Sequence, residues 1–349
     1  MYNFVNMKIL ADYDLKELFE IFSGEKRYLA GQILTFCHNG KTIDEMTSLS
    51  KEFREKLKSE YVSTGIEILK EFKGKDGTSK FLMKLSDDEL IESVFMTNNY
   101  GNTICVSTQV GCRMGCKFCA SGKDGLFRNL SAGEILGQIL TVNRYMGGTV
   151  NDRKISNVVL MGSGEPLDNY DSVIKFLSLL NEKNGINVSE RNVSLSTCGL
   201  CDKVYDLADS GHHPTLTFSL HAPNDEIRRE IMPIAKKYSV KDIVKAAKYY
   251  FEKTGRRIIF EYSLINGVND KSEHAKALAN LIKGFPCHVN LIRLNKIEKS
   301  ELLPSMTANE FKAELEKSGV SATIRRSLGS DVEGACGQLK RRYLCKDEL

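Results

Sequence analysis

Three cysteines, Cys112, Cys116 and Cys119, stand within eight residues in the run GCRMGCKFCASG. Thiolates bind metals, and three of them in one glycine-flanked loop can surround a compact metal centre, although a fourth ligand is missing. Structural zinc sites use four protein ligands, whereas an iron–sulfur cluster tolerates three cysteines and one iron open to a small molecule. The alternative is that all three are packing residues, which a glycine-rich loop disfavours. The spacing therefore favours an iron–sulfur cluster.

This CxxxCxxC run has an aromatic residue, Phe118, before its last cysteine and a pattern of alternating strands and helices behind it. It resembles the radical S-adenosylmethionine (radical SAM) superfamily. The resemblance implies two cofactors, a [4Fe–4S] cluster and S-adenosyl-L-methionine (SAM). It also implies that SAM chelates the open iron through its amino and carboxylate groups, and that an electron from the cluster cleaves SAM to a 5′-deoxyadenosyl radical.

Several predicted strands end in residues suited to a cofactor pocket. These strand-end residues are Gly162, Gly164, Glu165, Ser196, Ser219, Leu220 and His221. The C-terminal ends of strands in βα folds meet at one face, so we expect these residues to line one site. Glycine allows the backbone to approach a ligand closely, and Glu165 can accept the ammonium group of SAM.

Other strings extend the resemblance over nearly the whole chain. Cys105 stands seven residues before the cluster run in CVSTQVGC, and Cys336 lies in GACGQL near the C-terminal end. Together with SLHAPNDEIRR and GEPLDN, these strings resemble the RlmN/Cfr family of radical-SAM RNA methyltransferases, which modify one adenine of 23S ribosomal RNA. The RlmN type, which methylates carbon 2 of the adenine, is favoured.

The family resemblance also implies three catalytic roles. Cys336 accepts a methyl group by polar transfer, and a second SAM supplies the radical that removes one hydrogen from it. The resulting methylene radical adds to the adenine, and Glu92 in LIESVFM matches the base that takes the ring proton. Cys105 then attacks Cys336 to release the product, which leaves a disulfide that must be reduced. A radical is needed because a ring carbon of adenine is too poor a nucleophile to displace the methyl group of SAM.

Each of these residues has a structural alternative. Cys105 lies in an apolar run, where a cysteine is ordinarily a packing residue, and an isolated Glu92 would be a surface carboxylate. Cys336 lies in the non-periodic segment GSDVEGACGQL, which indicates a loop thiol. Asn295 in NLIRLNK matches a SAM-contacting position of the family, although Lys296 replaces the proline that often follows it. The remaining cysteines are interpreted as structural: Cys37, Cys198, Cys201, Cys287 and Cys345.

Basic residues bracket the Cys336 segment: Arg325, Arg326, Lys340, Arg341 and Arg342. They form either a solvated surface or a set of phosphate ligands beside the base that enters the site. Residues 1–98 carry 14 Lys and Arg against 17 Asp and Glu, so the net charge of +4 arises in the rest of the chain. With the family resemblance, this favours 23S rRNA as the partner, and also transfer RNA, with the target adenine swung out of its stack.

The elements that position these residues change in type near residue 100. Before it, apolar residues at helical spacing, such as Leu15 and Leu18, predict a helical accessory domain over residues 1–62. Two apolar runs around GKDGTS predict a β-hairpin linker over residues 63–98.

From residue 99 onward, β-rich runs alternate with helical segments. The runs are ICVST, SNVVLMG, NVSLST, TLTFSLH, RRIIFEYSLI, HVNLIRLN and SATIRRS. They predict an α/β fold, a partial (βα)6 radical-SAM barrel over residues 99–349 that ends in the catalytic-cysteine loop. Capping boxes at Ser131 with Glu134 and at Thr307 with Glu310 predict where two of the helices begin.

The composition of the 349 residues, 42% hydrophobic and 27% charged, excludes a mainly disordered or collagen-like chain. No run approaches the roughly 20 apolar residues of a membrane helix, and the first residues turn acidic where a signal peptide would be apolar. We therefore expect a cytoplasmic, reducing location without a membrane partner, and we interpret the final KDEL as chance. We also expect a monomer and a flavodoxin- or ferredoxin-like electron donor.

Two alternatives to carbon-2 methylation stay open at this point. NLIRLN and SGKDGL lean toward methylation at carbon 8 of the same adenine, which would confer resistance to ribosome-targeting antibiotics, whereas GEPLDN, SLHAPNDEIRR and GNTICVSTQVGC favour carbon 2. The other alternative is a non-catalytic iron–sulfur protein that binds RNA or senses redox state. The joint presence of Cys105, Cys336 and Glu92 argues against it, since a sensor needs none of them.

Overall fold

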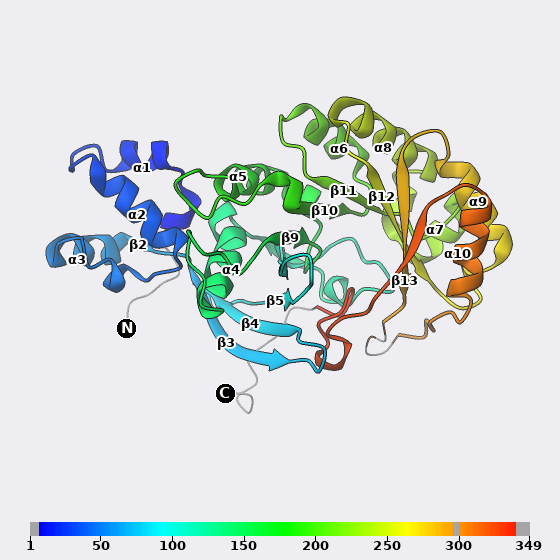
Figure 1. Cartoon of the computed structure of the whole chain (residues 1–349), viewed down its shortest axis with the longest axis horizontal. Helices are drawn as coiled ribbons and strands as arrows, with labels where there is room; N and C mark the ends of the chain where they lie inside the picture. The colour runs from blue at the N-terminus through cyan, green and yellow to red at the C-terminus, as the bar shows by residue number, and fades with distance from the viewer. Residues whose placement is uncertain (1–6, 296, 298–299, 340–349) are drawn as a thin grey trace.

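The computed structural model describes residues 7–295, 297 and 300–339. Five residues that the sequence analysis singled out lie outside these ranges: Lys296, Lys340, Arg341, Arg342 and Cys345. The largest element in the described ranges is a ten-stranded sheet with the order β14-β13-β12-β11-β10-β9-β6-β5-β4-β3. Because β14 and β3 form its two edges, the sheet curves without closing into a full barrel (Figure 1).

Seven strands of this sheet are parallel, and each corresponds to one of the seven predicted runs. They are β6 (Thr103–Cys105), β9 (Asn157–Leu160), β10 (Val193–Thr197), β11 (Thr215–Ser219), β12 (Ile258–Leu264), β13 (Cys287–Arg293) and β14 (Ala322–Arg325). A parallel neighbour needs a crossover connection, and the helices supply it. The expected partial barrel is therefore confirmed.

The crossover helices cover the sheet on its outer side (Figure 1). They are α4 (Ala132–Tyr145), α5 (Tyr170–Leu180), α6 (Cys201–Asp209), α7 (Asp225–Ile231), α8 (Val240–Thr254), α9 (Ser272–Ile282) and α10 (Ala308–Lys317). The predicted capping box at the start of α4 is present, because Ser131 and Glu134 each accept from the other's backbone N–H. The box predicted at Thr307 is wrong. The Thr307 hydroxyl instead donates to Asp270 O at 2.9 Å, although α10 does begin at the next residue.

Three antiparallel strands extend the sheet on one side: β3 (Ile66–Lys73), β4 (Ser79–Leu85) and β5 (Leu90–Met96). The first two form the predicted hairpin around GKDGTS. β5 then pairs with β6, so this hairpin is continuous with the parallel strands (Figure 1). A separate short hairpin, β7 (Gln109–Gly111) and β8 (Leu126–Asn129), lies between β6 and α4 and carries the cysteine run in its loop.

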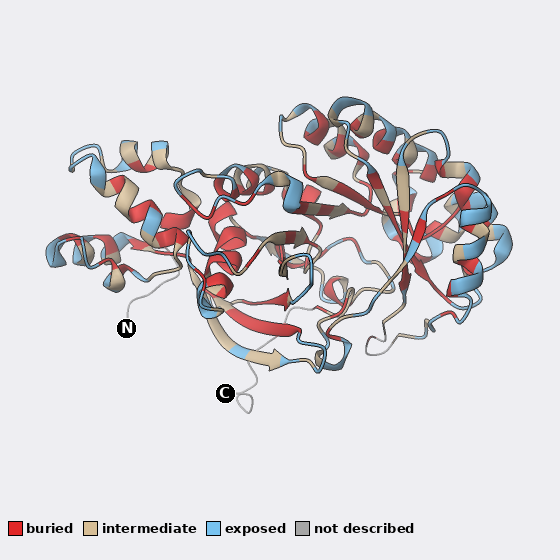
Figure 2. Ribbon diagram, viewed as in Figure 1, coloured by how far each residue is buried: buried red, intermediate tan, exposed pale blue. Residues whose placement is uncertain are grey.

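The N-terminal residues fold into helices α1 (Leu15–Ile21), α2 (Tyr28–His38) and α3 (Lys51–Glu60), with the short strands β1 (Lys8–Ile9) and β2 (Tyr61–Val62) pairing in parallel. Leu18, Ile33 and Leu57 form part of a small core of their own. The main core lies between the curved sheet and its helices, where Figure 2 shows the buried residues gathered. Within the described ranges, none of the helices has the length and apolar character needed to span a bilayer.

Candidate active site around the cysteine loop

The three cysteines lie in the loop of the β7–β8 hairpin. Backbone hydrogen bonds shape this loop, with Cys112 N donating to Gly125 O at 2.9 Å and Cys119 N donating to Cys116 O at 3.1 Å. All three side chains line one cavity. The structure therefore brings the predicted cluster ligands to one site.

The three thiols lie close enough to influence one another. Burial raises the pKa of Cys112 to about 12, and the neighbouring Cys119 also raises it. Burial likewise raises the pKa of Cys116, and the charges of Cys119 and Cys112 raise it further. No group of three His, Cys, Asp or Glu side chains in the described ranges is arranged to hold a single metal ion. Three clustered thiolates repel one another, so this donor set fits an iron–sulfur cluster, whose several irons spread positive charge, better than a lone ion.

The same cavity receives residues from the C-terminal ends of β9, β10, β11 and β13. Its lining includes Gly162, Gly164, Glu165, Ser196, Ser219, His221, Asn295 and Cys336. Six of the seven residues expected to contact SAM therefore share this cavity with the cysteine loop. The seventh, Leu220, is fully buried, and its backbone N donates to Glu261 O at 3.1 Å. Cys198, which the sequence analysis treated as structural, also lines the cavity.

Glu165 is buried, and backbone groups orient its carboxylate. Oε2 accepts from Cys198 N at 2.7 Å, and Oε1 accepts from Leu167 N at 3.1 Å. Burial raises the pKa of Glu165, and the hydrogen bond from the Cys198 backbone opposes that rise. Each carboxylate oxygen has further acceptor capacity, so this group can still accept a ligand ammonium.

Close packing explains the two glycines before Glu165. A Cβ on Gly162 would lie 2.6 Å from Val106 O, and a Cβ on Gly164 would lie 2.7 Å from Gln109 Cβ. Gly164 also has φ +109°, a conformation that other residues rarely adopt. The end of β9 therefore requires glycine in order to pack against the segment that joins β6 to β7, whether or not a ligand approaches it.

His221 is held in a left-handed conformation (φ +56°) at the end of β11. Its Nδ1 accepts from Ser263 N at 2.9 Å, and its carbonyl accepts from Asn269 Nδ2 at 2.8 Å. Its ring meets Phe118 edge to face, with 4.7 Å between the ring centroids. Burial lowers the pKa of His221 to about 3, so the imidazole is neutral near pH 7 with its proton on Nε2.

Glu261, within β12, is a site residue that the sequence analysis missed. Its Oε2 accepts from the hydroxyls of Ser196 at 3.3 Å and Ser219 at 3.5 Å, and its Oε1 accepts from Arg325 Nη1 at 2.9 Å. The available signal was a lone carboxylate inside the apolar run RRIIFEYSLI, because buried charges are normally paired. Arg325 was expected on a solvated surface or against phosphate, but its guanidinium is ion-paired with Glu261.

Cys105 and Cys336 both line a second cavity, whose walls also include Met96, Met161, Asn295, Arg325, Arg326 and Leu339. Both thiols are free. Burial raises the pKa of Cys105 to about 12, and the nearby Cys336 adds to the rise. Burial also raises the pKa of Cys336, and the charge of Arg325 opposes this rise. Cys336 is in the lining of both cavities and therefore stands at their junction.

The segment that carries Cys336 is docked on the cysteine loop. Asn295 Nδ2 donates to Cys336 O at 3.1 Å, and Ala120 N donates to Gly337 O at 2.8 Å. Ser121 Oγ donates to Leu339 O at 2.6 Å. These bonds tie an otherwise irregular segment to the loop that holds the three cysteines.

Glu92 lies on β5, two residues before Val94, which pairs with Cys105 of β6. Side chains two apart on a strand share a face, so Glu92 faces the same side of the sheet as Val94. Judged without the family resemblance, Glu92 was expected to be a surface carboxylate. That expectation is wrong, because Glu92 is 1% exposed and forms an ion pair with Lys80 at 3.2 Å. Among the described residues, Glu92 is in the lining of neither cavity.

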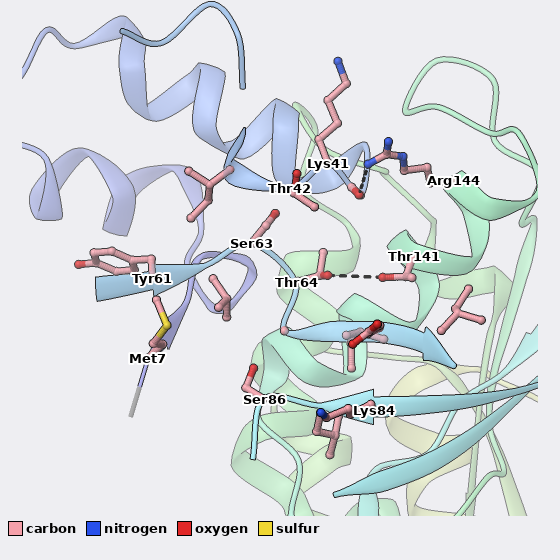
Figure 3. Close-up of a pocket in the computed structure, with 18 of the residues that line it drawn as sticks. Met7, Lys41, Thr42, Tyr61, Ser63, Thr64, Lys84, Ser86, Thr141 and Arg144 are labelled. Atoms are coloured by element: carbon pink, nitrogen blue, oxygen red, sulfur yellow. Dashed lines mark hydrogen bonds between the residues drawn. The ribbon is translucent and has the colours of Figure 1, made fainter. Parts of the chain in front are cut away.

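A larger cavity lies apart from the cysteines, between the N-terminal helices, the start of β3 and α4 (Figure 3). Thr64 and Thr141 both line it, and their hydroxyls are hydrogen-bonded to each other at 3.4 Å. Arg144 closes one side by donating to Gly40 O at 2.8 Å. None of the described residues to which the sequence assigned chemistry lines this cavity.

Comparisons with known proteins show which family the chain belongs to. Residues 106–279 match the radical SAM superfamily, and residues 5–62 match the ribosomal RNA large subunit methyltransferase N-terminal domain. A probable dual-specificity RNA methyltransferase RlmN of Clostridium novyi (strain NT) is 47% identical over 345 residues, which cover 97% of this chain and 99% of that protein. The chain belongs to the RlmN family. The protein of the same name from Clostridium perfringens (strain 13 / Type A) is 49% identical over 346 residues, which cover 97% of this chain and 98% of that one.

A solved structure supports the same family. The crystal structure of a radical SAM methyltransferase from Sphaerobacter thermophilus superposes with a TM-score of 0.91 at 39% identity, covering 95% of this chain and 98% of that one. As an RlmN-family member, the chain is a radical SAM RNA methyltransferase, and its cofactors are a [4Fe–4S] cluster and SAM. The alternative of a non-catalytic RNA-binding or redox-sensing protein is therefore wrong.

Proposed function

We propose that this enzyme methylates carbon 2 of an adenine in 23S rRNA, and also in transfer RNA, through an S-methylcysteine at Cys336. The main support is the position of Cys336 in the lining of two cavities. One cavity holds the three cysteines of the loop, and the other holds Cys105. A residue at this junction can receive a methyl group on one side and meet the second catalytic thiol on the other.

In this proposal, Cys112, Cys116 and Cys119 hold the cluster. SAM is contacted by Gly164, Glu165, Ser196, Ser219, Leu220, His221 and Asn295. When bound, the two cofactors supply a methyl group and, after one-electron reduction, a 5′-deoxyadenosyl radical. Glu165 orients the ligand through its carboxylate, and neutral His221 acts through its backbone rather than as a base.

The chemistry on the protein falls to three residues. Cys336 carries the methyl carbon to the adenine, and Glu92 takes the proton from the ring carbon. Cys105 then attacks the sulfur of Cys336, so that an S–S bond forms as the bond between that sulfur and the methylene carbon breaks. The unpaired electron left on the adduct by the radical addition would return to the cluster, and the released methylene carbon takes up a proton to become the new methyl group. A reductant must then restore the two thiols. The location of both free thiols in one cavity supports this exchange.

Further parts of the proposal concern partners and organisation. The exposed Arg326, beside the second cavity, is available for an RNA phosphate. We also propose a flavodoxin- or ferredoxin-like electron donor, a monomeric enzyme and a cytoplasmic location. The proposed domains are a helical accessory domain over residues 1–62, a linking hairpin over 63–98 and the barrel over 99–349.

Mass spectrometry of the modified nucleoside tests the reaction. Ribosomal and transfer RNA lacking the modification would be incubated with reduced, cluster-loaded enzyme and SAM, digested, and separated against standards of 2-methyladenosine and 8-methyladenosine. We expect 2-methyladenosine as the main product, with 8-methyladenosine at most a minor one. A product that contains 8-methyladenosine alone would contradict the proposal, because the two outcomes differ only in which edge of the adenine faces Cys336.

A further inference from the structure

Arg228, in helix α7, is completely buried. Its Nε donates to Leu220 O at 3.0 Å, and its Nη2 donates to Cys198 O at 2.6 Å and to Ser219 O at 3.3 Å. Its Nη1 has no hydrogen-bond partner in the described part of the chain. A buried guanidinium nitrogen without an acceptor costs free energy, so this atom calls for an explanation.

The charge of Arg228 also lacks a carboxylate partner. None of the ion pairs among the described residues includes it, and a guanidinium stays protonated in proteins. Burial lowers the pKa of Arg228, and the thiols of Cys198 and Cys116 are the neighbours that most oppose this effect. Cys116 is one of the three cysteines of the loop.

The segment that follows Arg228 packs against the cysteine loop. Lys117 N, between two of the cysteines, donates to Ile231 O at 3.0 Å. A Cβ on Gly115 would lie 3.5 Å from Pro233 Cγ. An apolar cluster that includes Cys112, Met114, Cys198, Ile231 and Met232 fills this contact and excludes water. The guanidinium therefore lies in a dry region directly behind the loop, where charge effects are strong.

We infer that Arg228 is the buried counter-charge of the iron–sulfur cluster and raises its reduction potential. This inference rests on the proposed assignment of the cluster to the three cysteines. Three thiolates make the cluster site anionic, and Nη1 is a donor without a hydrogen-bond partner on a buried cation that interacts electrostatically with Cys116, one of the three cysteines. A nearby positive charge and N–H donors to sulfur favour the reduced cluster, which carries one more electron. Arg228 thereby makes the reduction that precedes radical formation easier.

The test is the midpoint potential of the reconstituted cluster, measured by redox titration with electron paramagnetic resonance. R228M removes the buried charge. R229M is the matched control, because Arg229 is the next residue of the same helix but is exposed to solvent. We expect R228M to lower the equilibrium constant for one-electron reduction about tenfold, which is about 59 mV toward more negative potential. R229M should stay close to the wild type, because water and salt screen its charge.

Two further variants separate a charge effect from a structural one. R228Q keeps an amide donor for the carbonyls of Cys198 and Ser219 but lacks the charge, so it should show the same negative shift, and it replaces R228M if that variant does not fold. R228K keeps the charge, so it should retain the iron and have a midpoint potential close to that of the wild type. A potential in R228M and R228Q no lower than in R229M would overturn the inference.

Iron and sulfide content, measured on the same samples, provide a second outcome. Loss of the cluster from R228M and R228Q with retention in R228K supports a counter-charge, whereas equal loss in R228K would overturn it. The cluster assignment itself is tested separately by replacing Cys112 with alanine. Full iron retention in C112A would refute the proposed ligand set whatever the potentials of the Arg228 variants.

Discussion

Arg325 and Glu261 form an ion pair in the wall between the two cavities of the site, with 2.9 Å between Nη1 and Oε1. Glu261 lines the cavity of the cysteine loop, and Arg325 lines the cavity that contains Cys105. Cys336 lines both. Burial raises the pKa of Cys336 most, Arg325 lowers it, and Glu261 raises it. The balance of this ion pair therefore controls how readily Cys336 ionises to accept a methyl group.

Breaking the ion pair from its two sides should move the pKa of Cys336 in opposite directions. E261Q leaves Arg325 unopposed and should lower it, whereas R325M should raise it, each by at least about half a unit, or roughly 0.7 kcal/mol. The measurement is the pH dependence of iodoacetamide alkylation at Cys336, followed by peptide mass spectrometry. A C112A background keeps Cys336 unmethylated. E273Q, at a carboxylate 71% exposed, is the control and should leave the midpoint unchanged. Shifts of the same sign in E261Q and R325M would contradict this role.

The buried pair of Lys80 and Glu92 predicts a large stability effect. Both side chains are at most 2% exposed, so K80M would remove the cation that is ion-paired with a buried carboxylate and should lower the free energy of unfolding by about 3–5 kcal/mol. K84M is the matched control on the same strand. It breaks a pair with Asp88 whose members are 33% and 70% exposed, which is worth roughly 0–1 kcal/mol. Urea unfolding measures both, and equal losses in K80M and K84M would show that the buried pair contributes no more than the exposed one.

Much of the fold follows from the sequence because local patterns determine it. Apolar β-rich runs alternating with helical segments identified the seven parallel strands of the ten-stranded sheet, since strand and helix periodicities differ. The capping box at Thr307 failed for a non-local reason. Its hydroxyl donates to Asp270 O, 37 residues away, and no local pattern reports that acceptor.

The site was predictable where residue type and spacing carry the chemistry, as in the cysteine run and the strand ends. Glu261 and Arg228 were missed because their importance comes from burial and from partners distant in sequence. Glu261 meets Arg325 from 64 residues away, and Arg228 meets Cys198 from 30. The same is true of Glu92, because an isolated carboxylate in the sequence is normally exposed and the local sequence gives no sign that Glu92 is buried beside Lys80.

The buried His221 predicts a pH-dependent contribution to stability. Its folded pKa of about 3 lies below the unfolded value of 6.5, so between these values the unfolded state binds the extra proton. Stability should therefore rise with pH across this window and fall on acidification, by up to about 1.4 kcal/mol per unit from this group. H221N tolerates the positive φ and keeps an acceptor for Ser263 N. Between pH 6.5 and 5 the free energy of unfolding of H221N should fall by roughly 2 kcal/mol less than that of the wild type. Parallel plots of unfolding free energy against pH for the variant and the wild type would contradict this assignment.

The proposed exchange between Cys105 and Cys336 predicts a trapped intermediate. In C105A the adenine becomes joined to Cys336 through the methylene carbon, and the thiol that would displace it is absent. We therefore expect a protein–RNA adduct that survives denaturing electrophoresis, shifts to lower mass after ribonuclease treatment, and maps to the Cys336 peptide by mass spectrometry. The C105A/C336A double variant should form none. C37A is the matched control, because Cys37 is also buried but lies in the N-terminal core, so it should release free product. Free product from C105A at the wild-type rate would show that Cys105 only packs against Val94 and Leu339, the buried neighbours it has in the structure.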